Sequence, residues 1–509
     1  MINSTKANSF KSFSDSRSNG FLLAAFLLVF SALLAAFLLL FIDDDVWKAA
    51  ANWYLLPWII LTAAVLLAPI GYLLYYKKFD PFHPLVQASW SYWFPAFVIG
   101  GLVIASGYIY PYQMSLIADH QTDFKWTYIY IMIGFLGMTA GFCLPLGKRG
   151  GAYLSRKLPA WDWEPQQVLL PAIIFLSVGL FFYISAFISG IVGFSKVDMT
   201  DSFATLNYML SLLALQAGFL VAIYIFKAKR ITPQHLIAFG VIGIVLFSRL
   251  SLGGNRGSLL LIVYLLAMAF VYSGRKLKFL HGVIFGTVAV LAILIGMVYG
   301  TTFRNIKGAE ERTGIGEQMD YVGQTLEAVT TQDTGKVLDE AFYNLGERID
   351  GVSSVAVVVS NYERLKPFEA DYGLENNIIT ELWTMFIPRF LWANKPLIYD
   401  ARSYSDLYFN FSGNSYAMTP VGDLLRNFGP IGVPIGMLIV GIFLRLIYAM
   451  LIEDQAVTIG RATAYYMFIA TVSYEGYYTT IILYGWRVLL IVFVTFLLTD
   501  FFLIRKKRL

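Results

Sequence analysis

Long apolar runs recur along this chain and constrain its fold more than any motif does. An α-helix needs about 20 residues to cross the hydrocarbon core of a membrane, and most of the runs approach that length. Backbone groups in lipid must be hydrogen-bonded within the protein, and the runs lack the alternation of barrel strands. We therefore expect an all-α polytopic membrane protein. About twelve spans are predicted, near residues 21–42, 55–76, 87–110, 126–146, 167–192, 207–227, 236–250, 258–273, 279–300, 430–452, 461–475 and 486–504.

Composition agrees with this class. The chain is 58% hydrophobic and 14% charged, whereas soluble proteins carry about 25% charged residues. The net charge of +5 reflects membrane topology, so no nucleic-acid partner is expected. The one cysteine, Cys143, lies in an apolar run and excludes a disulfide framework or a thiolate metal site within one chain. The first run follows a polar segment without a small-residue cleavage site, which indicates an uncleaved first span.

Lysine and arginine gather in alternate connections between the runs. These connections contain Lys6 to Arg17, Lys77 and Lys78, Lys148 to Lys157, Lys227 to Arg230, Arg275 to Lys278, Arg461, and Arg505 to Arg508. The positive-inside rule makes them cytoplasmic, together with both termini. Residues 301–429 then form one large outer loop. It separates a membrane domain over 1–300, with about nine spans, from a second over 430–509, with about three.

The outer loop is acidic and predicted to be mainly helical. It carries 18 acidic and 11 basic residues. Apolar residues recur at helical spacing in three stretches, namely Met319 to Val329, Leu338 to Leu345 after a cap at Asp333 or Thr334, and Leu374 to Phe386. The third stretch ends before Pro388. These stripes predict helices that pack on one another or on the membrane surface.

Basic residues nevertheless approach the outer membrane face at several places. In SRLSLGGNRGS, glycines that allow close backbone approach surround Arg256, with Arg249 before them. The other such residues are Arg304, Arg348, Arg389, Lys395 and Arg426. Arginine forks and lysine point charges are suited to a pyrophosphate. The alternatives are salt bridges to the acidic loop and side chains that extend to lipid headgroups.

Three carboxylates lie near these basic clusters and are candidates for a catalytic base: Asp350, Asp400 and Asp423. An adjacent arginine lowers the pKa of a carboxylate, which suits ion pairing at least as well as base chemistry. Three of the four histidines are predicted to be cytoplasmic, so a histidine zinc site is not expected. Asp43 to Asp45 could hold a divalent cation or end the first span as solvated residues.

Several motifs together resemble the Wzy-type O-antigen polymerases, the oligosaccharide repeat-unit polymerase family. FIPRFLWANKP, from Phe386 to Pro396, resembles the Pro-Arg…Trp-x-x-Lys-Pro signature of that family. LSLGGNRGSLL resembles its Gly-x-Arg-Gly turn, KKFDPFHPL its cytoplasmic Asp-Pro…Pro element, and TPVGDLLRNFGPIGVPIGMLIVGIF its return to the membrane. The chain departs from the pattern at Ala393 and Asn394, where the family often has Pro and Asp.

The resemblance implies a GT-C-like glycosyltransferase that needs no metal or other cofactor. It would join repeat units linked to undecaprenyl pyrophosphate at the periplasmic face of a bacterial inner membrane. Arg256, Arg389 and Lys395 would then contact the pyrophosphate. The products would be O-antigen, capsule or exopolysaccharide, and a chain-length regulator and a flippase would be partners. The aromatics from Tyr399 to Tyr416 would pack on sugars or form an interfacial belt.

Two other functions remain open from the sequence. An O-antigen-ligase-like transferase would use the same lipid-linked donor with a different acceptor, and arginines do not distinguish it from a polymerase. A transporter of lipid-linked oligosaccharides should carry charges within its spans. Here the mid-span charges are few, chiefly Arg445.

Overall fold

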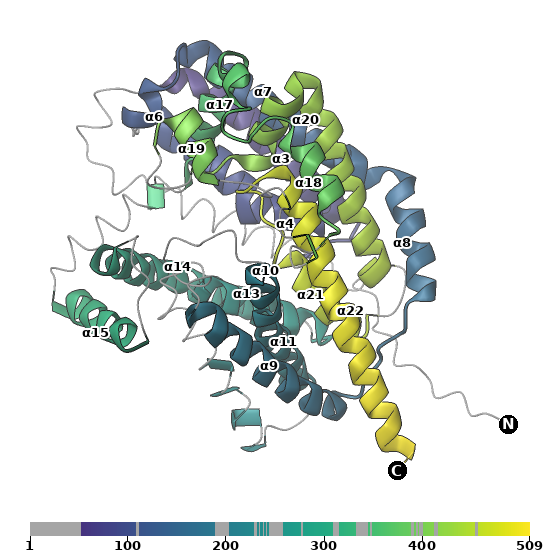
Figure 1. Cartoon of the computed structure of the whole chain (residues 1–509). Helices are drawn as coiled ribbons and strands as arrows, with labels where there is room; N and C mark the ends of the chain where they lie inside the picture. The colour runs from purple at the N-terminus through teal and green to yellow at the C-terminus, as the bar shows by residue number, and fades with distance from the viewer. Residues whose placement is uncertain are drawn as a thin grey trace.

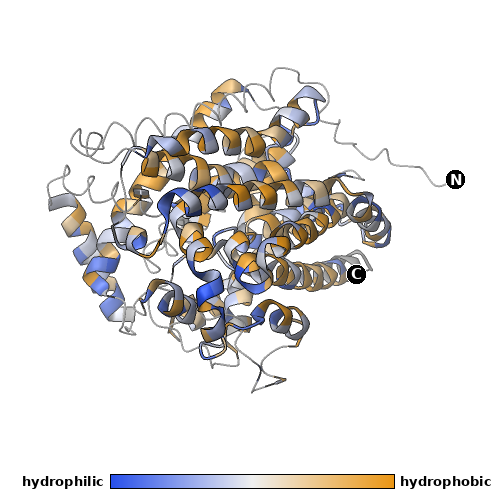
Figure 2. Cartoon of the chain, turned by 90° about the horizontal axis from the view of Figure 1, so that it is seen from above, coloured by the Kyte–Doolittle hydropathy of each residue, from blue (hydrophilic) through white to orange (hydrophobic). Residues whose placement is uncertain are grey.

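The computed structural model is helical throughout the residues it describes. These residues are 52–107, 111–188, 203–228, 232–233, 235–237, 239–240, 242–243, 258–275, 278–308, 315–331, 345–346, 349–387, 391–392, 395, 401–411, 416–453 and 457–508. Within them, eight helices are long and apolar enough to cross a membrane. Hydrophobic residues dominate the long helices (Figure 2). The prediction of a helical polytopic membrane protein is thus confirmed.

The eight long helices correspond to eight of the predicted spans. They are Trp53–Tyr75, Pro84–Ala105, His120–Cys143, Pro165–Ile188, Leu206–Lys227, Phe279–Lys307, Thr419–Glu453 and Tyr478–Phe501. Two more predicted spans are shorter helices, α13 (Ser258–Tyr272) and α21 (Ile459–Ile469). Residues 21–42 lie outside the described residues, as does most of 236–250. The count of twelve therefore stays a prediction.

The helices form two groups that meet along α21 and α22 (Tyr478–Arg508) (Figure 1). The first group contains α3 (Leu56–Tyr75), α7 (His120–Cys143), α8 (Pro145–Lys157), α17 (Gly351–Leu365) and α20 (Thr419–Tyr448). The second contains α9 (Leu169–Ile188), α10 (Ala204–Ser211), α11 (Leu213–Lys227), α13 and α14 (Phe279–Lys307). One large core of buried apolar side chains runs through both groups.

Shorter helices complete the chain between these elements. α4 (Pro84–Ala88) continues through two π-helical turns, η3 (Ser89–Trp93) and η4 (Pro95–Ile99), into α5 (Gly100–Ala105). The others are η2 (Trp53–Leu55), α6 (Pro111–Ser115), η5 (Pro165–Val168), α15 (Ile315–Thr331), η6 (Lys366–Phe368), α18 (Asn377–Thr384), α19 (Ala401–Phe409) and η7 (Ala449–Glu453).

α7 and α20 approach each other closely because glycines line their interface. A Cβ atom on Gly141 would overlap the carbonyl oxygen of Leu438, and one on Gly441 would overlap that of Met138. Small residues let membrane helices pack backbone to backbone, where dispersion and polar contacts replace the hydrophobic effect. This contact fixes the position of α20, which carries the candidate site.

We expect Gly141→Leu to separate α7 from α20 and to destabilise the protein by about 3 kcal/mol or more, because the obstacle is backbone. The loss should appear as a lower midpoint of thermal unfolding in detergent. Gly71→Leu is the matched control, since a Cβ at Gly71 of α3 meets nothing within 4 Å. Equal midpoints for the two variants would contradict the close contact.

Two helices of the C-terminal region are interrupted. Inside α20, Gly429 has φ +69° and ψ −167°, a conformation essentially restricted to glycine. α21 ends at Ile469, and residues 470–477 are irregular before α22 begins at Tyr478. Non-helical backbone at membrane depth is tolerated where it is buried in protein or lines a cavity. The beginning of α20 contacts the beginning of α22, since the backbone N–H of Tyr478 donates to Asp423 and that of Thr419 donates to the Glu475 carbonyl oxygen.

Residues 301–429, which the sequence predicts to be an outer loop and which we call the outer segment for that reason alone, partly follow the sequence prediction. α15 confirms a helix over Met319 to Val329, and α18 confirms one over Ile378 to Leu382. Residues 332–344, most of the second predicted helix, lie outside the described residues. α17 was not predicted. The helices at both ends of this segment also differ from the prediction. α14 continues past residue 300 to Lys307, and α20 starts at Thr419 instead of near residue 430.

Candidate functional site

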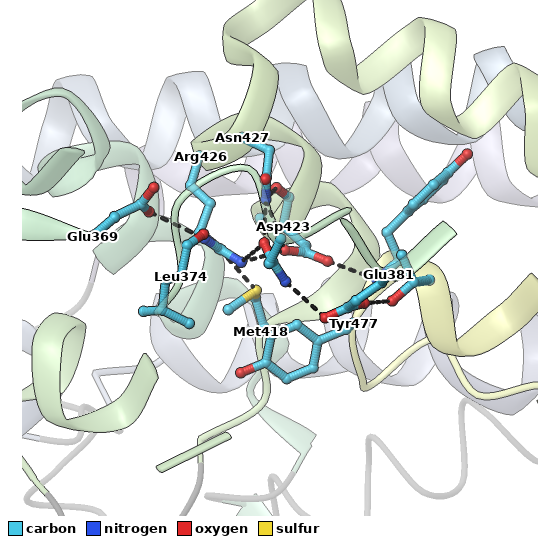
Figure 3. A network of polar contacts seen from close by, with 12 residues as sticks. Glu369, Leu374, Glu381, Met418, Asp423, Arg426, Asn427 and Tyr477 are labelled. Carbon is cyan, nitrogen blue, oxygen red and sulfur yellow. Dashed lines mark hydrogen bonds and ion pairs between the residues drawn. The ribbon is translucent and has the colours of Figure 1, made fainter. Parts of the chain in front are cut away.

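A buried cluster of charged and amide side chains joins the outer segment to the starts of α20 and α22 (Figure 3). We call it the Arg426 network. α20 contributes three of its members at i, i+3 and i+4, a spacing that places them on one helix face. The members are Asp423, Arg426 and Asn427 of α20, Asn377 and Glu381 of α18, Thr479 of α22, and Glu369 after η6.

Arg426 is the centre of this network and is 0% exposed. Nη1 donates to Glu369 Oε1 at 3.2 Å and to the Leu374 carbonyl oxygen at 2.9 Å. Nη2 donates to Asn377 Oδ1 at 2.6 Å and to Asp423 Oδ1 at 2.9 Å, while Nε faces Met418 Sδ at 3.4 Å. The guanidinium has five N–H groups. In this conformation all five are directed at protein acceptors.

Asp423 connects the network to α22. Its Oδ1 accepts from Arg426 and, at 3.2 Å, from Asn427 Nδ2. Its Oδ2 accepts from the backbone N–H of Tyr478 at 2.9 Å, at the first residue of α22. The unpaired N–H groups and the dipole at a helix start favour a negative charge there. Asp423 therefore caps a membrane helix and pairs with Arg426 at the same time.

Glu381 is buried on the other side of the network, and burial raises its pKa to about 8, with a further increase from Asp423. Its Oε1 accepts from Asn377 Nδ2 at 3.0 Å, and Oε2 contacts the hydroxyl of Thr479. One guanidinium faces three carboxyl groups, those of Glu369, Glu381 and Asp423. A protonated Glu381 limits the buried negative charge and gives the site a neutral acid that can donate a hydrogen bond at pH 7.

Asp350, a candidate base from the sequence, lies at another place. It precedes α17 as its N-cap, and its Oδ1 accepts from the Ser353 backbone N–H at 2.9 Å. Burial raises the pKa of the Asp350 carboxyl to about 6. Next to it, the backbone of Gly351 packs against Ala96 and Phe97 of η4. The half-buried carboxyl thus stabilises a helix start, a role the sequence reasoning did not consider.

The remaining predicted residues divide into two groups. Lys395 is buried, and its Nζ donates to the carbonyl oxygen of Ile387, eight residues earlier in the chain, at 2.8 Å. Arg304 is half-buried in the last turns of α14. Predictions on five further residues lie outside the described residues: Arg249, Arg256, Arg348, Arg389 and Asp400. The structure brings Asp423 and Arg426 together but not Asp350.

Five members of the network were missed from the sequence: Glu369, Asn377, Glu381, Asn427 and Thr479. Asn377 and Glu381 are four residues apart in α18, so one helix face presents both. That spacing was a usable signal, but the sequence analysis considered only the apolar stripe of the same helix, as packing on another helix or on the membrane surface. In the structure the polar stripe is the buried one.

The tyrosine-rich stretch of the outer segment packs internally. Tyr404 and Tyr408 of α19 are buried, with ring centroids 5.1 Å apart, and Phe409 stacks on Tyr416 at 4.2 Å. The hydroxyl of Tyr408 donates to Glu369 Oε1 at 2.9 Å. These rings fix α19 on the Arg426 network. Tyr399 lies outside the described residues.

Among the described residues, no group of three or more His, Cys, Asp or Glu side chains could hold a metal ion. Asp43 to Asp45, the candidate cation cluster from the sequence, lie outside them. The Arg426 network combines its carboxylates with a central guanidinium, which already takes the place of a cation. It suits ion pairing and proton storage better than metal binding.

Comparison with known proteins gives one match. The model of a family described as "Domain of unknown function (DUF8712)" matches residues 172–502. This range contains every residue of the Arg426 network. No curated protein and no solved structure matches the chain. Because the match extends over more than half of the 509 residues, the chain belongs to the DUF8712 family.

Proposed function

We propose that the protein is a glycosyltransferase that polymerises oligosaccharide repeat units on undecaprenyl pyrophosphate at the periplasmic face of a bacterial inner membrane. The polymer would be O-antigen, capsule or exopolysaccharide. The motif resemblance to repeat-unit polymerases and the membrane-spanning helices support this proposal. A chain-length regulator and a flippase are the protein partners that the resemblance implies.

One structural observation carries the proposal furthest. The segment FIPRFLWANKP joins α18 to α19, and both helices are fixed on the Arg426 network. α18 is held through Asn377 and Glu381, and α19 through the Tyr408 bond to Glu369. The helices on both sides of the segment with Arg389 and Lys395 therefore contact a buried, charged site where α20 and α22 begin. Broken helices of this kind often border sites for anionic substrates.

Within this proposal the basic residues have two roles, contact with the pyrophosphate and positioning of other residues. A polyprenyl pyrophosphate is a good leaving group, so the reaction mainly needs positive charge where negative charge develops. Arg256, Arg389 and Lys395 are the proposed pyrophosphate contacts, with Arg249, Arg304 and Arg348 as further candidates. Arg426 would act as a positioning residue, because its N–H groups are directed at protein acceptors. Asp350, Asp400 and Asp423 remain the candidate bases for the acceptor hydroxyl.

The decisive experiment is to delete the gene and to size the lipid-linked glycans of the membrane. Accumulation of single repeat units on the outer leaflet would support a polymerase. Full-length polymer retained on its lipid carrier would indicate a ligase-like transferase instead. Single units confined to the cytoplasmic leaflet would indicate a transporter and would contradict the proposal.

We expect Arg256→Ala and Arg389→Ala each to abolish polymer formation while the protein still accumulates in the membrane. The reason is that each removes a bidentate donor from the proposed pyrophosphate site. Arg364→Ala is the matched control, since Arg364 is an exposed arginine of α17 in the same outer segment. Polymer of normal length and amount from both variants would overturn the assignment of these two residues.

A transporter of lipid-linked oligosaccharides is the second candidate. Discontinuous helices with buried ionisable groups occur in secondary transporters, and α20 and the α21–α22 pair share this feature. The size and leaflet of the accumulated glycans separate the two functions.

A further inference from the structure

α18 buries several polar side chains and exposes large apolar ones, whereas a helix at the surface of a protein in water does the opposite. Asn377, Glu381 and Thr384, spaced i, i+4 and i+7, are buried together with Ile378. Ile379 and Trp383 of α18 and Phe386, two residues beyond its end, have the same spacing and are exposed by 55%, 57% and 59%. A helix on the surface of a soluble domain shows the reverse arrangement. The exposed apolar side chains are therefore suited to an apolar environment.

The exposed stripe of α18 continues an apolar surface on α22. α18 lies beside the first part of α22 (Figure 1), and the rings of Phe386 and Trp486 meet edge to face with centroids 6.1 Å apart. From Trp486 onwards, one face of α22 stays exposed and apolar along a span of the membrane. Its residues are Trp486, Leu490, Val494, Leu497, Leu498 and Phe501.

We propose that α18 lies in the outer leaflet of the bilayer, with Ile379, Trp383 and Phe386 against lipid hydrocarbon chains. Continuity with the exposed face of α22 carries this assignment, because that face belongs to a helix long enough to span the membrane. Aromatic residues favour the membrane–water interface, and Trp383 has its ring centroid 5.7 Å from that of Trp392 in the following segment. Part of the region assigned to an outer loop is thus a membrane-inserted helix.

This placement explains why the polar stripe is turned inward. A helix at membrane depth cannot present Glu381 or Asn377 to lipid without a large desolvation penalty. Facing the bundle, Asn377 accepts from Arg426 and Asn427, and Glu381 accepts from Asn377 and Thr479. The Arg426 network would then be screened from lipid by α18 itself. The inference does not depend on the proposed function.

Nitroxide accessibility tests the placement directly. Cys143, the one cysteine, is exposed and is first replaced by serine. Single cysteines that replace Ile379 and Phe386 are then spin-labelled in proteoliposomes. Leu490→Cys is the reference for a position in lipid. Glu375→Cys is the reference for a position in water, because Glu375 is exposed before α18. We expect positions 379 and 386 to collide with oxygen and avoid nickel-EDDA, as position 490 does.

Two results would overturn the placement. Collision with nickel-EDDA at positions 379 and 386 at the level of position 375 would put α18 in water. Protection from both reagents would mean that protein covers this face. Photolabelling of the unmodified protein with a membrane-partitioning diazirine avoids any folding defect of the variants. Adducts on Trp383 or Phe386 as on Leu490 support the proposal, and adducts on Leu490 alone refute it.

Discussion

Arg426→Ala should leave a protein that does not fold stably. Removing one partner of a buried ion pair costs about 3–5 kcal/mol, because the other charge stays buried without compensation. Here Asp423 and Glu369 both lose their cation, and the Leu374 carbonyl and Asn377 lose a donor. Net stabilities of proteins are about 5–15 kcal/mol. We expect little protein in the membrane and a strongly lowered unfolding midpoint in detergent.

Three further variants show whether charge or geometry causes this loss. Arg426→Lys keeps the charge but has three donors instead of five, so an intermediate midpoint is expected. Arg364→Ala removes an exposed arginine and should have almost no effect. Arg426→Met combined with Asp423→Asn and Glu369→Gln removes all three charges and should regain part of the stability. An unchanged midpoint in Arg426→Ala would show that the network contributes nothing.

The membrane helices were predictable because a single physical requirement fixes them. Lipid provides no hydrogen-bond partners, so an apolar run of sufficient length must be helical. The expected runs 55–76, 279–300 and 486–504 reappear as parts of α3, α14 and α22. The start of α20 was placed too late, because a hydropathy pattern does not recognise its polar first turns around Asp423 and Arg426.

α17 shows the limit of local pattern in the outer segment. Its sequence GVSSVAVVVSNYERL is rich in valine and serine, residues of low helix propensity. Tertiary packing overrides that preference, since residues from Gly351 to Val358 are buried against the bundle. Asp350 before it is a good N-cap residue and was a helix-start signal. The sequence interpretation considered this aspartate only as a catalytic base.

The sequence predicted only two members of the Arg426 network, Asp423 and Arg426. Arg426 and Asp423 were recognised as charges next to a membrane span, and their pairing was among the alternatives. Arg426 bonds to Glu369, 57 residues away, and Asp423 bonds to Tyr478, 55 residues away, and no local rule joins residues at such separations. Burial also changes the role that a charged side chain can have. An arginine near lipid headgroups is an anion site, whereas the same residue with its donors directed inward is a structural centre.

Glu381→Gln should remove a pH dependence of stability. The pKa of the Glu381 carboxyl group is about 8 in the folded protein and about 4.3 in the unfolded chain. Between these two pH values, the folded state therefore keeps a proton that the unfolded state has released. Stability due to this group is fully present below the unfolded pKa and is lost as the pH rises towards 8. The slope is at most about 1.4 kcal/mol per pH unit. The midpoint of the wild type should therefore fall more between pH 5 and pH 9 than that of Glu381→Gln.

Glu375→Gln is the matched control, since Glu375 is exposed just before the same helix. Its midpoint should fall with pH as that of the wild type does. The contribution of the other carboxyl groups that titrate, Asp350 and Glu369 included, cancels because all three proteins keep them. Glutamine is nearly isosteric with protonated glutamate, so Glu381→Gln should match the wild type at pH 5 and exceed it at pH 9. Parallel curves for all three proteins would mean that Glu381 is already ionised in the folded state, stabilised by Arg426 and Thr479.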